Sequence, residues 1–190
     1  DTGPESHQIN GKDVAAHRRA GSTDGLRGRK RSLYEGGVRV PTLFHWPGKI
    51  PAGRAIDTPT STLDYLPTIS AVIGEAVPDD RPVDGVNILP LLLGDEFTRE
   101  PGIPFYSAGK LTLIEGDYKL VMMRTNKQKA ELYHLGTDRG ETDDIAKQYP
   151  DLVKAMLNRI DAFKASVKFS HQGGDYNDPA FKPVDQFPGQ

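Results

Sequence analysis

A run of short strand-like segments followed by one long amphipathic segment constrains the fold of this chain most. Between residues 105 and 135, β-branched, aromatic and other apolar residues come in short groups, and the Gly116-Asp117 pair suits a hairpin turn between the middle two. From residue 150 to about residue 167, apolar residues recur every three or four positions, which predicts a helix with one buried face. A small antiparallel sheet covered by this helix is therefore expected. The predicted strands are residues 105–106, 111–115, 118–123 and 131–135.

The first part of the chain predicts fewer regular elements. Residues 1–32 are polar and glycine-rich with little hydrophobic periodicity, which indicates a loop region. Residues 38–46 are rich in β-branched and aromatic residues and predict a largely buried strand. Pro41 argues against a central place in a sheet, because proline lacks the N–H group that a ladder needs.

A short helix is expected between Asp64 and Gly74. Asp64 is placed to cap its start and Gly74 to end it. Three apolar residues of this segment share one face: Leu66, Ile69 and Ile73. Residues 78–94 hold prolines and glycines around an apolar run, which indicates an ordered connection packed on the core. Residues 171–190, rich in Gly, Asp, Pro and Asn, predict an extended tail.

Charge and composition exclude several classes of protein. The chain has 24 Lys and Arg against 26 Asp and Glu, a formal net charge of −2, which provides no broad cationic face for nucleic acid or anionic lipid. It has no cysteine, so disulfides, thiolate zinc sites and a cysteine nucleophile are excluded. The apolar stretch at residues 88–93 is far shorter than the roughly 20 residues of a membrane-spanning helix.

Residues 26–41 contain the densest cluster of residues that could carry chemistry. Four cations fall within five positions: Arg27, Arg29, Lys30 and Arg31. Their mutual repulsion would be relieved by a phosphate-like or sulfate-like anion, or by an acidic partner. A solvated basic loop is the alternative interpretation.

The residues that follow this cluster are expected to have a structural role, not a catalytic one. The Gly36-Gly37 pair would allow backbone conformations and close approach that other residues resist. Glu35 is expected to pair with a local arginine, such as Arg39, and fix the loop. Lys119 is expected to belong to the small sheet and its surface.

Seven motifs, taken in order from residue 1 to about residue 145, resemble the C-terminal portion of a formylglycine-dependent sulfatase of the arylsulfatase type. They are D-T-G-P-E (1–5), L-R-G-R-K-R-S-L-Y-E-G-G-V-R-V-P (26–41), W-P-G-K-I-P-A-G (46–53), L-D-Y-L-P-T (63–68), D-G-V-N-I-L-P-L-L-L-G (84–94), G-D-Y-K-L (116–120) and L-Y-H-L-G-T-D-R-G-E (132–141). One such motif would be weak evidence, but seven in order are specific.

The resemblance implies an α/β fold of the alkaline-phosphatase-like superfamily. Residues 1–97 would complete the large catalytic domain, residues 98–170 would form a small subdomain of antiparallel sheet plus helix, and residues 171–190 would be the tail. Residues 1–5 have neither the basic start nor the apolar core of a signal peptide, so the chain is expected to be part of a longer protein.

The resemblance also implies a Ca²⁺ site. In that family the ion is held by several Asp carboxylates and an Asn side chain, and Asp1 matches the Asp of the last Asp-Asn pair. Thr2 stands where the Asn is expected, and its hydroxyl is a weaker ligand than an amide carbonyl. Hard oxygen ligands suit this cation, which can withdraw charge from sulfate oxygens.

Lys30 matches the family lysine that contacts the sulfate group of the substrate. Its ammonium would stabilise bound sulfate and the charge that develops on oxygen as the ester bond breaks. Arg29 and Arg31 replace the glycines usual on either side, which would suit a larger anionic substrate or leave both side chains in solvent. His7 is a further candidate for the substrate pocket, and His17, His45, His134 and His171 show no paired ligand spacing.

The family nucleophile is a formylglycine made from Cys or Ser in a C/S-x-P-x-R motif, and no Pro-x-Arg occurs in this sequence. The nucleophile and the remaining metal and sulfate ligands are expected in an upstream segment, and these 190 residues alone are expected to be inactive. The expected substrate is an aryl sulfate or sulfated glycan. Alternatives are a phosphodiesterase or phosphonate hydrolase of the same superfamily, a non-catalytic homologue that binds sulfated glycans, and a fragment without independent activity.

Such enzymes are usually exported, so the resemblance implies a periplasmic or extracellular location. The sequence has no N-x-S/T site, which favours a bacterial over a lysosomal source.

Overall fold

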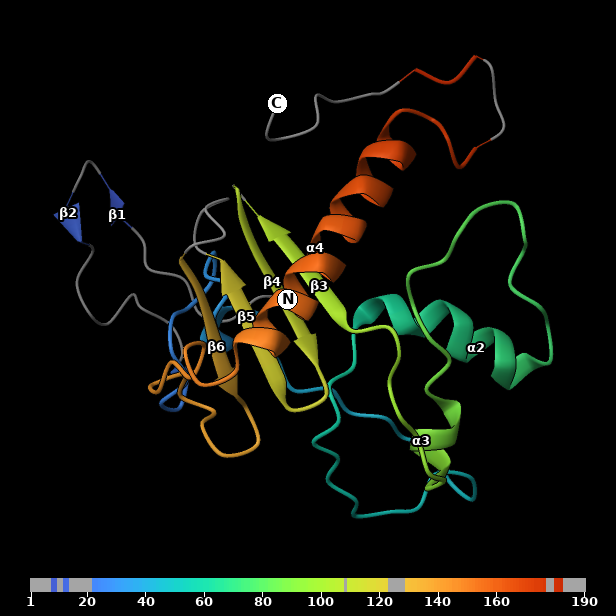
Figure 1. The fold of residues 1–190 in the computed structure, drawn as a ribbon. Helices are drawn as coiled ribbons and strands as arrows, with labels where there is room; N and C mark the ends of the chain where they lie inside the picture. The colour runs from blue at the N-terminus through green and yellow to red at the C-terminus, as the bar shows by residue number, and fades with distance from the viewer. Residues whose placement is uncertain are drawn as a thin grey trace. The chain divides into compact units, whose positions relative to one another are not determined.

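The computed structural model describes residues 8–9, 12–13, 22–107, 109–122, 129–176 and 180–182. They divide into two compact units (Figure 1). The first unit contains the described residues up to Thr42 together with Pro104–Asp161, and the second contains Leu43–Ile103 and the described residues from Ala162 onward. The predicted domain boundaries at residues 97 and 170 stay a prediction.

The first unit is built on a four-stranded sheet with the order β3-β4-β5-β6. Its strands are β3 (Ile103–Ser107), β4 (Lys110–Glu115), β5 (Tyr118–Met122) and β6 (Ala130–His134). Strands β4 and β5 pair antiparallel with Glu115 opposite Tyr118, so Gly116 and Asp117 form the predicted hairpin turn. Gly116 has a φ of 54°, in the left-handed region that such a turn favours. The predicted small antiparallel sheet is confirmed.

The two faces of this sheet are covered by different parts of the first unit. Because side chains alternate along a strand, Lys119 and Val121 of β5 point to one face and Leu120 and Met122 to the other. The first face meets residues 27–38, which lie behind the sheet in Figure 1. The other face carries Glu115, which forms an ion pair with Arg159 of α4. Because both faces of the sheet are buried, the sequences of its strands are nearly continuous runs of apolar residues.

Helix α4 (Pro150–His171) confirms the predicted amphipathic helix and extends four residues beyond the expected end. Proline suits its first position, because the N–H that proline lacks would have no partner in a first helical turn. Met156 and Ile160, one turn apart, are buried. Among the described residues, no helix is both long and apolar enough to cross a membrane.

The second unit contains η2 (Thr62–Asp64), α2 (Tyr65–Ile73) and α3 (Leu89–Leu93). Gly74 follows α2 with a φ of 77°, which confirms the predicted helix end. The connection after α2 is ordered as expected. It contributes three buried residues: Leu91 and Leu92 of α3, and Ile88, which precedes the first residue of that helix. The predicted face of α2 is exposed, with 53% of Leu66, 58% of Ile69 and 64% of Ile73 accessible.

The structure corrects the expected role of Asp64. The side chain that caps this helical segment is Ser61, which accepts from the Leu63 N–H in a capping box with Asp64. The buried Asp64 carboxylate accepts from the Ser61 and Val86 N–H groups and pairs with Arg99 at 2.6 Å. Asp64 therefore joins three segments of the second unit.

The predicted strand at residues 38–46 is wrong. Residues 35–38 form a short helix, α1 (Glu35–Val38), and residues 39–46 have no regular secondary structure. Pro41 removes a ladder donor, and Leu43 is 92% exposed, so this segment lacks the pairing and burial of a central strand in the described part of the chain.

The two ends of the chain are described only in part. Residues 22–32 are irregular, as predicted, but β1 (Gln8–Ile9) and β2 (Lys12–Asp13) form a short antiparallel pair where only loop was expected. In the predicted tail, the rings of Tyr176 and Phe181 stack with centroids 4.9 Å apart. Residues 177–179 and 183–190 lie outside the described residues.

Candidate functional site

Lys30 lies at the corner of a tight turn. The Ser32 N–H donates to the Arg29 carbonyl at 2.8 Å, which closes the turn around Lys30 and Arg31. Arg31 has a φ of 74°, a left-handed conformation that costs a non-glycine residue about 1 kcal/mol. Arg29, Lys30 and Arg31 are all exposed. The turn therefore carries three consecutive cationic residues at the surface, which we call the Lys30 turn (residues 29–32).

Helix α1 supports the Lys30 turn through its two glycines. The Gly36 N–H donates to the Arg27 carbonyl at 2.8 Å. A Cβ atom added to Gly36 would lie 2.4 Å from the Gly28 carbonyl oxygen, and one added to Gly37 would lie 2.2 Å from the Ser32 carbonyl oxygen. The predicted close backbone approach at this glycine pair is confirmed, because any side chain would push the turn off the helix.

The first residue of α1 belongs to a buried group of three charged side chains, Glu35, Lys119 and Glu141, which we call the buried triad. Their exposed fractions are 3%, 0% and 1%. Lys119 Nζ lies 2.8 Å from Glu35 Oε1 and 2.9 Å from Glu141 Oε1, although the latter ion pair lacks hydrogen-bond geometry. Glu141 Oε2 accepts from the Glu35 N–H at 2.6 Å. The triad joins α1, β5 and the loop after β6.

The buried triad corrects one expectation and adds a partner to another. Lys119 is fully buried, not on the sheet surface, and it is the closest cation to Glu35. The expected pairing of Glu35 with Arg39 is confirmed, at 3.6 Å between Arg39 Nη1 and Glu35 Oε2, and Lys119 is an additional, nearer partner. Burial raises the pKa of the Glu141 carboxyl above its usual 4.5, against the opposing effect of the Lys119 ammonium. The motifs G-D-Y-K-L and R-G-E contained both residues, but nothing in their spacing indicated that they meet.

Arg27 of the cationic cluster is held by side chains of the sheet. Its guanidinium lies 3.8 Å from the centre of the Tyr34 ring and donates to Tyr133 Oη at 2.7 Å and to the Glu141 carbonyl at 3.0 Å. Tyr34 and Tyr133 both donate to Glu131 Oε2, and burial together with these bonds raises the pKa of both phenols. Arg27 thus anchors the start of the loop.

The loop that carries Glu141 is closed by Asp138. The Asp138 carboxylate accepts from the Thr142 N–H at 2.8 Å, the Thr142 hydroxyl at 3.0 Å and the Asp143 N–H at 2.9 Å. Burial opposes ionisation, but the hydrogen bonds from Asp143 and Thr142 outweigh it and hold the pKa of the Asp138 carboxyl below its usual 3.8. This carboxylate therefore stabilises the loop in its ionised form.

Replacing Asp138 with asparagine is expected to change the acid sensitivity of the fold. A carboxyl whose pKa is lower in the folded state stabilises the protein above its unfolded pKa, here 3.8, and this contribution is lost as the pH falls through the folded pKa. We expect Asp138→Asn to be about 1 kcal/mol less stable at neutral pH. We also expect its urea midpoint to fall less steeply than that of the unmodified protein below about pH 4. Parallel midpoint curves for the two proteins would contradict this role.

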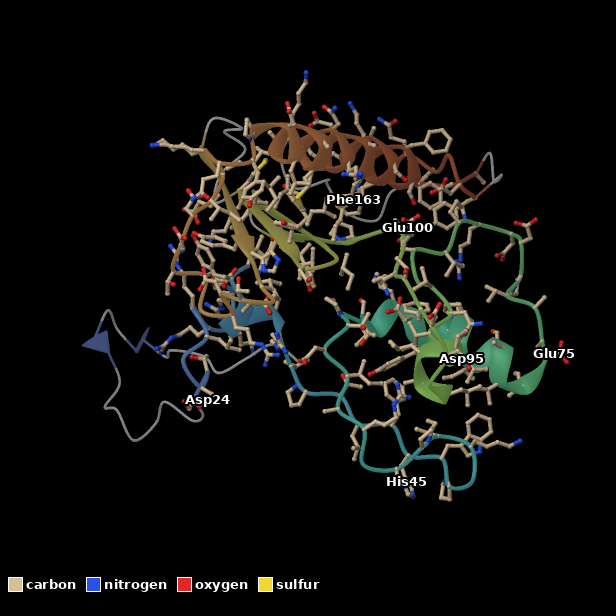
Figure 2. All side chains as sticks on the ribbon, turned by 60° about the horizontal axis from the view of Figure 1, so that its bottom comes forward. Asp24, His45, Glu75, Asp95, Glu100 and Phe163 are labelled. Atoms are coloured by element: carbon tan, nitrogen blue, oxygen red, sulfur yellow. The ribbon has the colours of Figure 1, made fainter. Side chains whose placement is uncertain are left out.

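The proposed metal ligands Asp1 and Thr2, the substrate-pocket candidate His7, and His17 lie outside the described residues. Among the histidines that are described, His45 is exposed and points outward from its loop (Figure 2). His134 Nδ1 lies 3.1 Å from the Thr137 hydroxyl, and its ring packs edge-on against Tyr118. No group of three His, Asp or Glu side chains in the described part of the chain is arranged to hold a metal ion.

Comparisons with known proteins agree with this architecture. The family model for "N-sulphoglucosamine sulphohydrolase, C-terminal" matches residues 28–166. Human arylsulfatase D is 42% identical over 96 residues, 50% of this chain and 16% of that protein. An N-acetylgalactosamine-6-O-sulfatase of Bacteroides thetaiotaomicron is 28% identical over 152 residues, 73% of this chain and 30% of that protein. The crystal structure of Ps i-CgsB is similar with a TM-score of 0.69 at 28% identity, over 77% of this chain and 33% of that one.

The sheet, the covering helix and the preceding turn thus define the class of protein as the C-terminal portion of an alkaline-phosphatase-like sulfatase. Because the family model spans most of the sequence, the chain belongs to the N-sulphoglucosamine sulphohydrolase C-terminal family. The resemblance and the expected fold class are confirmed. The chain spans only 16% of the length of human arylsulfatase D and 33% of that of Ps i-CgsB.

Proposed function

We propose that the protein containing this chain hydrolyses sulfate esters and that Lys30 binds the sulfate group. The observation that carries this proposal is the Lys30 turn, an exposed cationic corner whose backbone is held on the α1 glycines. A lysine on a turn with a fixed backbone can bind an anion without the entropy cost of ordering the loop on binding. Membership of the sulfatase family supports the reaction class.

Lys30 would act on both the bound and the reacting sulfate. In the bound ester its positive charge attracts the sulfate oxygens. As the bond between sulfur and the alcohol oxygen breaks, negative charge grows on oxygen, and a fixed ammonium nearby lowers the energy of that state. The nucleophile that attacks sulfur is proposed to be a formylglycine supplied by an upstream segment.

Ca²⁺ is the proposed metal, with Asp1 as one of its ligands and Thr2 as a weaker neighbour. The donor chemistry fits, since a carboxylate and a hydroxyl are hard oxygen donors. When bound, the ion would withdraw charge from the sulfate oxygens. His7 is proposed to reach the substrate pocket, because it follows this pair closely in the sequence.

A sulfated glycan is the proposed substrate, ahead of a simple aryl sulfate. Arg29 and Arg31 flank Lys30 on the exposed turn, and two further cations suit an oligosaccharide that carries more than one anionic group. The bacterial relative is named for a sulfated sugar, and Ps i-CgsB was solved in complex with k-i-k-neocarrahexaose. An exported, bacterial location is proposed for the same protein.

Sulfate release is the experiment that tests this function. The protein containing this chain is given an aryl sulfate, a sulfated oligosaccharide and a phosphodiester, before and after removal of Ca²⁺. We expect sulfate release that falls at least tenfold on chelation, about 1.4 kcal/mol of transition-state stabilisation, and returns with added Ca²⁺. Hydrolysis of the phosphodiester to a phosphomonoester and an alcohol, without sulfate release, would favour a phosphodiesterase. A folded protein that carries formylglycine but only binds the oligosaccharide would favour a non-catalytic homologue.

A further inference from the structure

The buried triad is not explained by stability alone. Removing two carboxylates and an ammonium from water is costly, and apolar residues of similar volume often give a fold that is equally stable or more so. What a buried ionic group does provide is a fixed position, because each charge must keep its partners. Glu35, Lys119 and Glu141 fix one point of the first unit, which is the first residue of α1.

Direct contacts lead from this fixed point to the two ends of the Lys30 turn. Glu35 is held by its side chain, which pairs with Lys119, and by its N–H, which donates to Glu141. The next residue, Gly36, donates its N–H to the Arg27 carbonyl. Gly37 then lies so close to the carbonyl oxygens of Arg29 and Ser32 that no Cβ would fit. A shift of Glu35 would therefore be passed on, through backbone contacts, to both ends of the Lys30 turn.

The backbone of Glu141 gives a second reason to assign it a role. It has a φ of 53°, in the left-handed region where glycine is accommodated at least cost. A glutamate at this position is strained, yet its two carboxylate oxygens meet Lys119 and the Glu35 N–H. The contacts of the side chain therefore account for the residue type.

We propose that Lys119 and Glu141 are positioning residues for sulfate binding, which hold the Lys30 turn in place through Glu35 and helix α1. This inference rests on the proposed role of Lys30. Neither residue needs to touch the substrate, since both are buried behind the helix that supports the turn. A displacement of about 1 Å in a binding group is enough to weaken a charged contact severely.

Glu141→Gln is the variant that tests the proposal. A glutamine has the same shape but only one acceptor oxygen, so its amide NH₂ must face either the Lys119 ammonium or the Glu35 N–H. The measured quantity is the dissociation constant for inorganic sulfate, determined by calorimetry on the whole protein. We expect binding at least fivefold weaker than that of the unmodified protein.

Asp64→Asn is the matched control. Asp64 is likewise a buried carboxylate that accepts from backbone N–H groups and pairs with a buried cation, but it belongs to the second unit. It loses a comparable set of contacts, so it reports the effect of lower stability alone. We expect its sulfate dissociation constant to stay within twofold of the unmodified value. An equal weakening in both variants would overturn the positioning role.

A double-mutant cycle separates this inference from the proposed function. If Glu141 acts through Lys30, Glu141→Gln will have no further effect on sulfate binding in a Lys30→Ala protein. Sulfate binding that is weakened by Lys30→Ala but unchanged by Glu141→Gln would overturn the positioning role alone. Binding unchanged in Lys30→Ala, or no binding in the unmodified protein, would overturn both proposals. If Glu141→Gln does not fold, Glu141→Asp replaces it in the same measurement. Aspartate keeps the negative charge, but its side chain is one methylene shorter, so the same weakening of sulfate binding is expected.

Discussion

Replacement of Lys30 by alanine is expected to lower the kcat for sulfate-ester hydrolysis about 100-fold, or about 2.7 kcal/mol in transition-state stabilisation. The ammonium is proposed to stabilise charge that grows on oxygen as the ester bond breaks, so its loss should lower kcat as well as raise KM. The measurement is steady-state sulfate release by the whole protein. Lys30→Arg keeps the charge but not the shape of the ammonium, and an intermediate rate is expected.

Lys49→Ala provides the control for this experiment. Lys49 is also an exposed lysine in a tight turn, where its N–H donates to the Trp46 carbonyl at 3.1 Å. It belongs to the second unit and has no proposed role in the reaction. Its replacement should leave kcat within twofold. A kcat for Lys30→Ala that is as high as that of the control would show that Lys30 takes no part in the chemistry.

Replacement of Lys119 by methionine is expected to lower the free energy of unfolding by about 3–5 kcal/mol. Methionine fills a similar volume, but it leaves Glu141 buried without the Lys119 ammonium at 2.9 Å and leaves Glu35 with only the more distant Arg39, at 3.6 Å. Breaking a buried ion pair from one side costs far more than the pair itself contributes. The measurement is the urea unfolding curve of the whole protein, with the slope used to check that the folded and unfolded states are unchanged.

Arg159→Met tests whether burial is the cause of that loss. Arg159 pairs with Glu115 at 3.1 Å, a distance similar to those around Lys119, but its side chain is 55% exposed. A solvent-exposed pair contributes only about 0.2–1 kcal/mol, so a small change is expected. If Arg159→Met and Lys119→Met lowered the free energy of unfolding by similar amounts, burial of the triad would not be the cause of the loss.

Local patterns predicted a large part of the fold. The Gly116-Asp117 turn and the strands on either side follow from short groups of β-branched, aromatic and other apolar residues and a two-residue hairpin signal, both of which act between near neighbours. Helix α4 follows from apolar residues at spacings of three and four and from Pro150 at its start. Gly74 ended α2 as expected because a left-handed residue after a helix is a local requirement.

Other expectations were wrong because tertiary contacts outweigh local preference. Residues 39–46 have the composition of a strand, but a strand also needs a partner, and Pro41 weakens pairing. Asp64 was expected to cap α2, but its carboxylate instead accepts from Val86 and pairs with Arg99, 35 residues away. Such a contact depends on how loops meet, which no window of neighbouring residues contains.

The candidate site divides in the same way. By itself, the sequence determined the hairpin, the long helix, the cationic turn at Lys30 and the glycine pair that follows it, because each depends on residues close along the chain. Only the tertiary structure decided that Lys119 and Glu141 reach Glu35, across 84 and 106 residues. The physical reason is burial: charged side chains that look like surface residues in the sequence become partners only when the sheet and α1 exclude water around them.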